Sequence, residues 1–502
     1  MSNPLYDALF ASLAVRDTAF LILADGHEIS GTAFHADIAR IANALRGLGV
    51  QPGDRVAVQI AKSPQALAVY AATTSIGAIF LPLNTAYTAD ELDYFLGNAT
   101  PAVFLCDPTK ADALAPVAAR HGAQLLTLGA KADGTLPALM ADQPASFTAT
   151  DRSGRDLAAI LYTSGTTGRS KGAMLTHDNL LSNARTLAAL WRFTAQDTLL
   201  HALPIFHTHG LFVASNISLL TQGKMIFLPG FDGETTLRLL PRATAMMGVP
   251  TFYTRLLDTP AFDAAATAHM RLFISGSAPL LAETHSAFQA RTGHRILERY
   301  GMTETNMNTS NPYDGERRAG TVGFPLPDVE LKITVEGRSV AQGDVGMIEV
   351  RGPNVFAGYW QMPEKTREEL RDDGWFLTGD LGKIDADGYV HIVGRAKDLI
   401  ITGGYNVYPK EVELLLDEVP GVLESAVIGL PHPDFGEAVF AVLTAQKGAA
   451  IDADAVLAAI RDKLARFKQP KAAVVVADLP RNTMGKVQKN LLRAEYAGWF
   501  AG

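Results

Sequence analysis

Strand-like and helix-like segments alternate along the first three hundred residues of the chain. Arg55–Gln59 and Ala78–Leu83 have the composition of short strands, and Pro64–Gly77 and Ala89–Leu96 have helical spacing. Such alternation predicts an α/β fold of layered subdomains around largely parallel sheets. The pattern continues through the expected strands Ala102–Cys106, Asp197–Ala202, Lys224–Leu228, Ala245–Gly248 and Met270–Ser275 and the expected helices Phe34–Gly49, Ala111–His121, Asp178–Trp191, Leu211–Leu220 and Glu283–Thr292.

The pattern changes beyond about Gly320. Short alternating strands between Gly- and Asp-rich turns predict a β-rich subdomain there, and a compact α+β tail of about a hundred residues follows Arg395. We therefore expect a large N-terminal domain over residues 1–395 and a small C-terminal domain over residues 396–502. The tail is expected to contain the helices Pro409–Asp417 and Ala453–Leu464 and the strands Val422–Leu430, Ala438–Thr444 and Ala472–Val476.

Bulk composition excludes several classes of protein. The 502 residues are 48% hydrophobic and 19% charged, which is ordinary for a soluble globular enzyme with more than one core. A formal net charge of −8 argues against a nucleic-acid partner, and a single cysteine excludes an intrachain disulfide and a cysteine-based zinc site. The uncharged stretch Ser63–Ala89 contains too many polar residues for a membrane span. We expect a cytoplasmic protein with no membrane partner.

A glycine-rich polar stretch, Thr163–Lys171, directly follows the strand-like residues Ile160–Tyr162. Its glycines, hydroxyls and two cations, with no acid among them, suit a loop that binds polyphosphate. It is not a Walker A loop, because that motif places Ser or Thr directly after a Gly-Lys pair. A flexible linker is the alternative, which the cations and the preceding strand make less favourable.

Two further polar loops carry acids that suit a nucleotide. Glu304 stands between Thr303 and Thr305, a set of hard oxygen ligands that fits Mg²⁺ beside a phosphate. Asp380 follows Thr-Gly on an expected tight turn, where a carboxylate can accept both hydroxyls of a ribose. A solvated turn is the alternative for Glu304, and an ordinary turn acid is the alternative for Asp380.

Five motifs occur together in a fixed order: YTSGTTGRSKG, YGMTE, TGD, GRAKDLIITGGYNVYPKEVE and PRNTMGKVQK. In this combination the chain resembles the AMP-forming acyl-CoA synthetase (adenylate-forming) family over essentially its whole length. The resemblance implies ATP and coenzyme A as substrates, Mg²⁺ as cofactor and a mobile C-terminal domain. A carboxylate would attack the α-phosphate of ATP, and the CoA thiolate would then displace AMP from the acyl adenylate.

The resemblance assigns three catalytic residues. Lys486 would bridge the attacking carboxylate and the α-phosphate, and Glu304 would bind Mg²⁺. His207 would gate the acyl or the nucleotide site, with a structural role equally open. ATP would be bound by Thr163, Ser164, Gly165, Thr166, Thr167, Gly168, Arg169, Lys171, Gly276, Ser277, Ala278, Glu298, Tyr300, Gly301, Thr303, Asp380 and Arg395.

The C-terminal motifs imply a change of conformation between the two half-reactions. Lys397 matches the hinge of the family, and the loop of Gly403, Gly404 and Tyr405 would then reach CoA. Lysine acetylation of Lys486 by an acetyltransferase is a hypothesis from the same resemblance, since it would remove the charge that catalysis needs. Three basic residues could meet the CoA phosphates or form a solvated face, namely Arg466, Lys468 and Lys471.

One residue of the YGMTE region indicates which acid is activated. Arg299 precedes Tyr300 where the family commonly has an apolar pocket, and a buried cation needs an anion. We therefore expect a short dicarboxylate, and the closer resemblance is to malonyl-CoA synthetases, with malonate or methylmalonate as the acid. A salt bridge from Arg299 to Glu298 or Glu304 is the alternative. The acyl site is expected to comprise His207, Ser277, Arg299 and Met302.

Other functions stay open on the sequence alone. A ligase for another short dicarboxylate, a short monocarboxylate or an aromatic acid would need most of the same motifs. A carrier-protein ligase and a noncatalytic nucleotide-binding protein are further alternatives. The intact Lys486, Glu304 and Asp380 argue against the noncatalytic one.

Overall fold

The computed structural model describes residues 2–163, 170–403, 405–482 and 485–500. The chain divides into two compact units. Unit 1 comprises Met1–Glu330 and Arg351–Phe376, and unit 2 comprises Leu331–Val350 and Leu377–Gly502. In this division the β-rich segment belongs to the same unit as the C-terminal tail. The expected boundary at residue 395 marks where the predicted mobile domain begins, and it stays a prediction.

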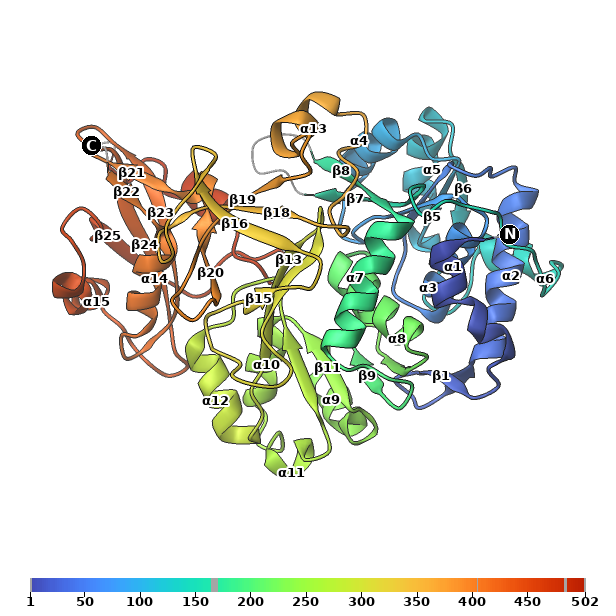
Figure 1. Ribbon diagram of the computed structural model, residues 1–502, viewed down its shortest axis with the longest axis horizontal. Coiled ribbons are helices and arrows are strands. Elements are labelled where there is room, and N and C mark those ends of the chain that lie inside the picture. The colour runs from blue at the N-terminus through green and yellow to red at the C-terminus, as the bar shows by residue number, and fades with distance from the viewer. Residues whose placement is uncertain (1, 164–169, 404, 483–484, 501–502) are drawn as a thin grey trace. The chain divides into compact units, whose positions relative to one another are not determined.

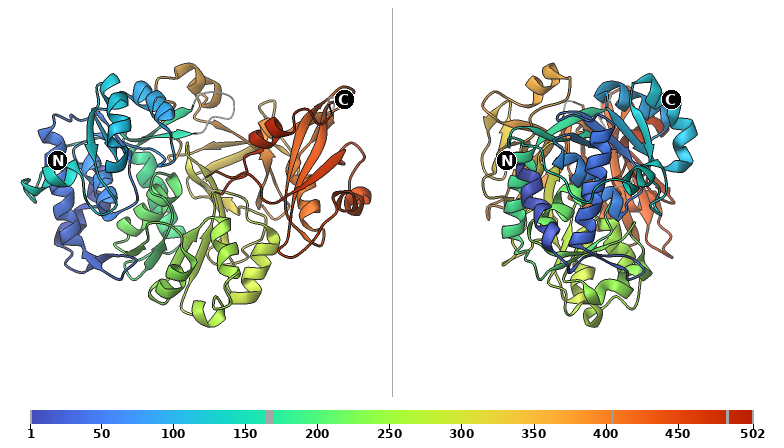
Figure 2. Two further views of the ribbon diagram at one scale, coloured as in Figure 1. Left: turned by 180° about the vertical axis from the view of Figure 1, so that it is seen from behind. Right: turned by 90° about the vertical axis from the view of Figure 1, so that its right-hand side faces the viewer.

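The first sheet of unit 1 has six strands in the order β6-β5-β3-β4-β7-β8. All neighbours are parallel except β7 and β8, which form an antiparallel pair. Helix α2 packs against α3 and α6, and α4 packs against α5, so helices flank both faces (Figures 1 and 2). The elements are β3 (Arg55–Gln59), β4 (Ile79–Pro82), β5 (Val103–Cys106), β6 (Gln124–Thr127), β7 (Leu157–Thr163), β8 (Lys171–Thr176), α2 (Gly31–Gly47), α3 (Pro64–Ser75), α4 (Ala89–Ala99), α5 (Ala111–Arg120) and α6 (Thr135–Ala141).

The second sheet of unit 1 has nine strands in the order β15-β14-β13-β12-β11-β9-β10-β1-β2. Its central strands are parallel, and β2, β14 and β15 are antiparallel to their neighbours. The strands are β1 (Ala19–Ile22), β2 (Glu28–Ser30), β9 (Thr198–His201), β10 (Lys224–Phe227), β11 (Ala245–Gly248), β12 (Leu272–Ser275), β13 (Leu297–Met302), β14 (Asn306–Ser310) and β15 (Phe324–Pro325).

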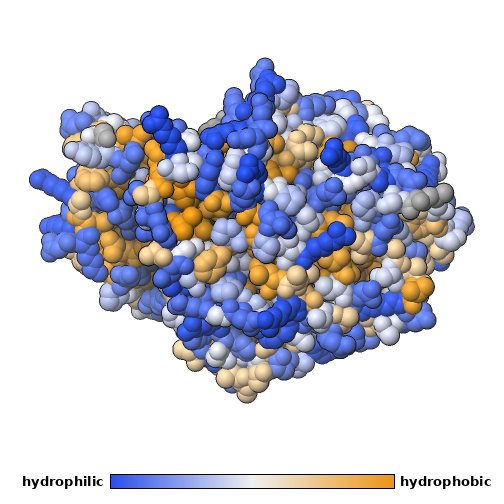
Figure 3. All heavy atoms as spheres, viewed as in Figure 1, coloured by the Kyte–Doolittle hydropathy of each residue, from blue (hydrophilic) through white to orange (hydrophobic). Residues whose placement is uncertain are grey.

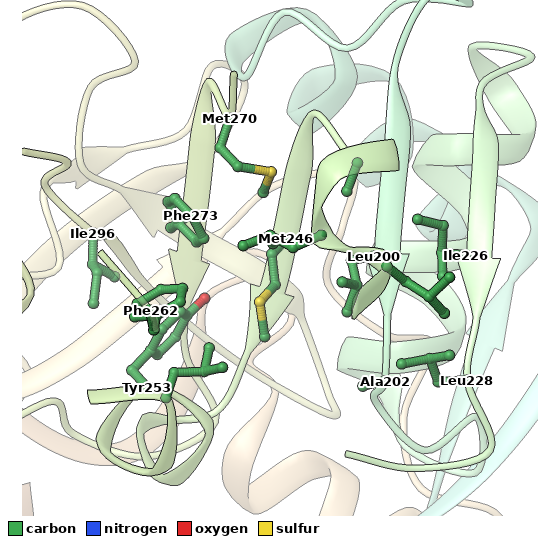
Figure 4. Close-up of a cluster of buried hydrophobic side chains, with 14 of the residues drawn as sticks. Leu200, Ala202, Ile226, Leu228, Met246, Tyr253, Phe262, Met270, Phe273 and Ile296 are labelled. Atoms are coloured by element: carbon green, nitrogen blue, oxygen red, sulfur yellow. The ribbon is translucent and has the colours of Figure 1, made fainter. Parts of the chain in front are cut away.

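The core beneath the second sheet is built from the apolar residues of these short strands. Leu200, Ile226, Met246 and Phe273 come from four neighbouring strands and are fully buried side by side (Figure 4). Continuous apolar runs are what a parallel sheet covered on both faces requires. The core therefore holds the carboxyl ends of β9, β11, β12 and β13 in fixed positions.

The remaining helices of unit 1 confirm most of the expected positions. The expected helix Leu211–Leu220 differs, because it begins earlier as a π-helix over His209–Ser215 and continues as α8 (Asn216–Leu220). A π-helix carries i→i+5 bonds, which hydropathy alone does not distinguish from an α-helix. The other helices are α1 (Pro4–Leu9), α7 (His177–Leu190), α9 (Gly233–Leu239), α10 (Pro250–Leu257), α11 (Ala264–Thr267), α12 (Ala282–Thr292) and α13 (Pro363–Glu369), and short 3₁₀ turns span Ala11–Val15, Pro108–Lys110 and Leu240–Arg242.

Unit 2 contains two five-stranded sheets. The first has the order β17-β16-β18-β19-β20, and the second joins β22-β21-β24-β23 with β25 parallel to β24. Both the β-rich segment and the α+β tail are therefore confirmed. The elements are β16 (Glu330–Val335), β17 (Arg338–Ser339), β18 (Gly346–Arg351), β19 (Phe376–Ile384), β20 (Val390–Arg395), β21 (Ile400–Thr402), β22 (Tyr405–Val407), β23 (Val422–His432), β24 (Gly436–Ala445), β25 (Ala472–Val476), α14 (Pro409–Asp417), α15 (Ala453–Ile460) and α16 (Lys489–Glu495), with 3₁₀ turns at Ala396–Asp398 and Arg461–Lys463.

Hydrophilic residues cover most of the face shown in Figure 3, and hydrophobic residues show between them. Among the helices that the structure describes, none has both the length and the apolarity needed to cross a membrane.

Candidate functional site

Arg299 is a buried cation on strand β13. Its residue is only 5% exposed, and Nε and Nη2 have no hydrogen-bond partner among the described residues. Burial lowers the pKa of Arg299 to about 9, although Tyr253 opposes that shift. Arg299 makes no salt bridge to Glu298 or Glu304 within the described part of the chain, so the alternative of internal pairing is not realised there.

Glu298 is the neighbour of Arg299 on the same strand, and its side chain has other partners. Its Oε1 lies 3.1 Å from Nδ1 of His285 and accepts from the backbone N–H of Gly320 at 3.3 Å. Successive side chains of a strand point to opposite faces, which separates Glu298 from Arg299. In this structure Glu298 links β13 to helix α12 through its contact with His285.

The end of strand β12 leaves room for the Arg299 guanidinium. A Cβ at Gly276 would lie 2.2 Å from Cζ of Arg299, so only glycine fits beside that side chain. The next residue, Ser277, has φ +72°, which is rare for a residue with a side chain. Backbone strain of this kind gathers at ligand sites, and Ser277 lies where the sequence predicts one.

Two histidines complete this region, and only one of them was predicted. His209, at the start of the π-helix, is fully buried; its Nδ1 lies 3.2 Å from Oγ of Ser277, and its Nε2 has no partner among the described residues. Burial and the charge of Arg299 lower the pKa of His207 to about 4 and that of His209 well below its ordinary value. Both imidazoles are therefore neutral near pH 7.

We call Arg299, His207, His209 and Ser277 the donor cluster. Arg299 and His209 contribute three buried nitrogen atoms without partners among the described residues. An unpaired buried donor is unfavourable, and an unpaired buried cation more so, unless a ligand supplies the acceptor. The cluster is therefore built to receive an anionic oxygen group.

Glu304 belongs to a second polar network in unit 1. The Tyr359 hydroxyl lies 3.0 Å from Oε1 of the buried Glu304 and 2.5 Å from Oε2 of Glu369, so its one proton is donated to one of the two carboxylates at a time. Lys171 Nζ donates to both Glu369 oxygens at 3.0 Å. Burial raises the pKa of Glu369, but the bonds from Tyr359, Lys365 and Lys171 outweigh it and lower the pKa overall.

This network joins the predicted phosphate loop to the predicted metal ligand. Thr163 ends β7 and Lys171 begins β8, and the two residues are antiparallel partners, so the loop connects a hairpin. Its residues Ser164, Gly165, Thr166, Thr167, Gly168 and Arg169 lie outside the described residues.

The structure contains no group of three potential metal-binding side chains among the residues it describes. Glu304 fits Mg²⁺ in a different way. Mg²⁺ typically takes one or two protein carboxylates and completes its shell with substrate phosphates and water. A single buried carboxylate next to the phosphate loop is the donor set that such an ion needs.

The other predicted residues of this region lie around the β13–β14 turn. Gly301 is indispensable there, because a Cβ would come 1.8 Å from the backbone oxygen of Asn306. The side chains that remain partly exposed are those of Ala278, Tyr300, Met302 and Thr303.

A charged cluster lies in unit 2. Asp380 and Arg395 are partners on β19 and β20, with Arg395 Nε 2.7 Å from Asp380 Oδ1. Lys486 is exposed, and its backbone exchanges hydrogen bonds with Asn482. Desolvation, and next the charge of Arg395, lower the pKa of Lys486 to about 8. Asp380 and Arg395 are thus paired, and the charges of both act on Lys486.

Lys397 lies on a 3₁₀ turn that follows β20. It is exposed, and partial desolvation lowers its pKa. The next residue, Asp398, is held by Arg493 of helix α16 at 2.6 Å. The chain is therefore fixed directly after the predicted hinge residue.

The predicted CoA-binding residues lie on one part of unit 2, except Gly404, which is outside the described residues. Gly403 has φ +57°, and Tyr405 is 61% exposed and stacks on Phe467 with ring centroids 4.8 Å apart. Arg466 and Lys471 are exposed, whereas Lys468 is paired with Glu411 at 2.6 Å. Lys468 is thus the least available of the three cations.

Comparisons with known proteins agree with this geometry. Residues 11–360 match the model of the AMP-binding enzyme family, and residues 411–486 match that of the AMP-binding enzyme C-terminal domain. A malonate–CoA ligase of Arabidopsis thaliana is 37% identical over 89% of this chain and 79% of its own length. A feruloyl-CoA synthase of an Amycolatopsis species is also 37% identical, over 91% of this chain and 92% of its own.

A solved structure extends the likeness to three dimensions. The crystal structure of ATP-bound MatB from Rhodopseudomonas palustris is 58% identical, covers 100% of both chains and superposes with a TM-score of 0.97. With matching family models over both parts of the chain and this motif set, the protein belongs to the AMP-forming acyl-CoA synthetase family of AMP-binding enzymes.

Proposed function

We propose that the protein joins malonate to coenzyme A through a malonyl-AMP intermediate, with release of pyrophosphate and AMP. The observation that carries the choice of acid is the buried Arg299, which lacks a partner at Nε and Nη2 among the described residues. A second carboxylate on the substrate satisfies both atoms, because a guanidinium binds a carboxylate with two parallel hydrogen bonds.

The reaction runs in two steps. One carboxylate oxygen of malonate attacks the α-phosphorus of ATP, the bond from that phosphorus to the bridging oxygen breaks, and pyrophosphate leaves. The thiolate of CoA then attacks the carbonyl carbon, and AMP leaves with the electron pair of the broken C–O bond. No group on the protein forms a covalent intermediate, so the protein acts by positioning and by stabilising charge.

We assign these functions to the residues of the chain as follows. Lys171 and the β7–β8 loop hold the outer phosphates, Asp380 and Arg395 hold the ribose, and Lys486 stabilises the charge shared by the carboxylate and the α-phosphate. Glu304 would hold Mg²⁺, which would neutralise part of the phosphate charge. When ATP is bound, Lys171 pairs with an outer phosphate of ATP and no longer with Glu369.

The donor cluster explains why malonate is preferred over monoacids. An acid with a methyl group in place of the second carboxylate leaves Arg299 buried and unpaired. A site built to bond a polar group can reject an analogue without it by a factor of about 10⁴. Feruloyl-type aromatic acids lack the second carboxylate as well.

A substrate panel tests the proposal. We expect pyrophosphate release with ATP, Mg²⁺ and malonate, a CoA thioester of malonate identified by mass, and a lower rate with methylmalonate. Butyrate, acetate and ferulate are expected to give no more than traces. Comparable turnover of butyrate, or faster turnover of methylmalonate than malonate, would reject malonate as the preferred acid.

We also propose that acetylation of Lys486 inhibits the enzyme. The side chain is exposed, so an acetyltransferase can reach it, and acetylation removes the positive charge that is proposed to act on the α-phosphate. The test is incubation with a lysine acetyltransferase and an acetyl donor, followed by peptide mass analysis and an assay. Unmodified Lys486, or modification with full adenylation activity, contradicts it.

A further inference from the structure

Lys62 follows strand β3 of the six-stranded sheet and reaches strand β9 of the nine-stranded one. Its Nζ donates to Nδ1 of His201 at 2.9 Å, to the backbone oxygen of His201 at 2.8 Å and to that of Leu203 at 2.9 Å. Burial lowers the pKa of Lys62 well below its ordinary value, and the three acceptors match the three N–H donors of its ammonium form. Nζ also lies 4.2 Å from the ring centroid of Phe227, a favourable cation–π distance.

His201 extends this contact to the π-helix. Its Nε2 lies 2.8 Å from the backbone oxygen of Gly210 and 3.1 Å from Oγ of Ser215, which itself donates to the Gly210 oxygen at 2.9 Å. A carbonyl oxygen only accepts, so Nε2 carries the hydrogen and Nδ1 is free to accept from Lys62. Burial and the charge of Lys62 hold the pKa of His201 well below its ordinary value, which keeps this neutral form.

These bonds hold both ends of one loop, residues 203–210. Lys62 binds the carbonyl of Leu203 directly and binds that of Gly210 through His201. The two ends lie close together, since a Cβ at Gly210 would come 2.0 Å from the backbone oxygen of Pro204. The loop between them carries His207 and His209 of the donor cluster.

The middle of the same loop has a separate anchor. Oγ1 of Thr208 donates to Oδ1 of Asn306 at 2.7 Å, on the strand that pairs with that of Arg299. Lys62 and His201 therefore hold the two ends of the loop, and β14 holds Thr208 between them. We expect that removing the hydrogen bonds of Lys62 shifts His207 and His209 without removing any group of the donor cluster.

We propose that Lys62, acting through His201, is a positioning residue for the acyl site: it fixes the loop that places His207 and His209 beside Arg299. Lys62 contacts neither substrate nor ATP in this account. The inference rests on the proposed function only in its choice of malonate as the acid.

The test compares Lys62→Met with Lys131→Met, a matched change of an exposed lysine. For Lys62→Met we expect the KM for malonate to rise about tenfold, the effect of about one net hydrogen bond, while the KM for ATP changes by less than about twofold. The discrimination of malonate over butyrate is expected to fall as well. Lys131→Met should match the unmodified enzyme in both constants.

A second measurement separates positioning from general loss of structure. In Lys62→Met, hydrogen exchange should speed up at the amide of Leu211, which is bonded to the backbone oxygen of His207 at 3.0 Å, and stay unchanged in β3. Lys62→Arg, which keeps the charge and donors, should restore part of the malonate KM. If Lys62→Met fails to fold, Ser215→Ala serves instead and should shift the malonate KM alone, by a smaller factor.

Equal rises in the KM for malonate and for ATP, or no change in either, overturn the inference. Failure of the proposed function is recognised separately, because the unmodified enzyme would then turn over another acid in preference to malonate. The same variants are in that case compared with the preferred acid, and the positioning role stands or falls on its KM against that for ATP.

Discussion

At the scale of single residues, the burial of the Arg299 charge is unfavourable, and we propose that this residue selects the substrate. Replacing a buried ion pair by apolar side chains of similar volume is often neutral or stabilises a protein by about 1–4 kcal/mol, and a buried charge without a partner lacks even the attraction within such a pair. We therefore expect Arg299→Leu to raise the free energy of unfolding of the ligand-free protein, measured by urea denaturation. The same variant should no longer be stabilised by malonate. A less stable Arg299→Leu would indicate that the guanidinium already has a structural partner.

Ser277 offers an independent check on the same site. Because its φ of +72° is a conformation that glycine adopts without strain, Ser277→Gly should relieve about 1 kcal/mol of backbone strain. It also removes the hydroxyl that lies 3.2 Å from His209. We expect a protein at least as stable to urea as the original, with a higher malonate KM. Loss of stability with an unchanged malonate KM would contradict a role for Ser277 in the site.

Lys486 gives the reaction a pH dependence whose sign follows from its pKa. The value of about 8 means that the ammonium form predominates below pH 8 and is lost as the pH rises through it. Since the positive form is the one proposed to act, kcat for adenylation should fall above about pH 8. Lys486→Arg stays charged, so its lower rate should remain flat from pH 8 to 10. A profile of the same shape in both proteins would assign the titration to another group.

At the scale of elements, the β13–β14 hairpin holds Arg299 on its first strand and Glu304 in its turn. The turn depends on Gly301, whose Cβ would lie 1.8 Å from the Asn306 oxygen. Gly301→Ala should therefore separate these strands and weaken the binding of malonate and ATP together. We expect the KM for each to rise several-fold. Gly230→Ala, at an exposed position with open space around it and no positive φ, is the control for glycine loss. Normal kinetics in Gly301→Ala would contradict the hairpin's role.

The elements also show what sequence reasoning can and cannot reach. The short apolar strands β3, β4, β9, β11 and β12 were predicted, because runs of buried residues bounded by turns are a local signal. The pairing of β1 with β10 was not, since it joins residues about two hundred positions apart. The π-helix was expected as an α-helix beginning two residues later, because hydropathy alone does not distinguish the two kinds of buried helix.

The candidate site divides in the same way. Arg299 could be singled out, because a cation inside an expected apolar pocket is visible in the sequence. That its Nε and Nη2 lack partners among the described residues depends on the directions of Glu298 and Tyr253, which only coordinates give. His209 was missed although it is two residues from His207, and the strained Ser277 beside it is the feature that finds it.

At the scale of the whole molecule, we predict that the chain rotates about Lys397 between the two half-reactions. The following residue is fixed by Arg493, so rotation is confined to the bonds before Asp398. Proline locks φ, and Lys397→Pro should therefore leave adenylation, measured by ATP–pyrophosphate exchange, largely intact while abolishing thioester formation. Equal loss of both half-reactions would argue against a hinge at this position.

The central claim is that the buried guanidinium of Arg299 binds the second carboxylate of the acid and thereby selects the substrate. The most direct measurement is the ratio of kcat/KM for malonate to that for butyrate, determined by ATP–pyrophosphate exchange in the unmodified enzyme and in Arg299→Leu. We predict a ratio of about 10⁴ in the unmodified enzyme. In Arg299→Leu the ratio should fall to about one or reverse, with the KM for ATP little changed. A ratio that survives the loss of Arg299 would contradict it.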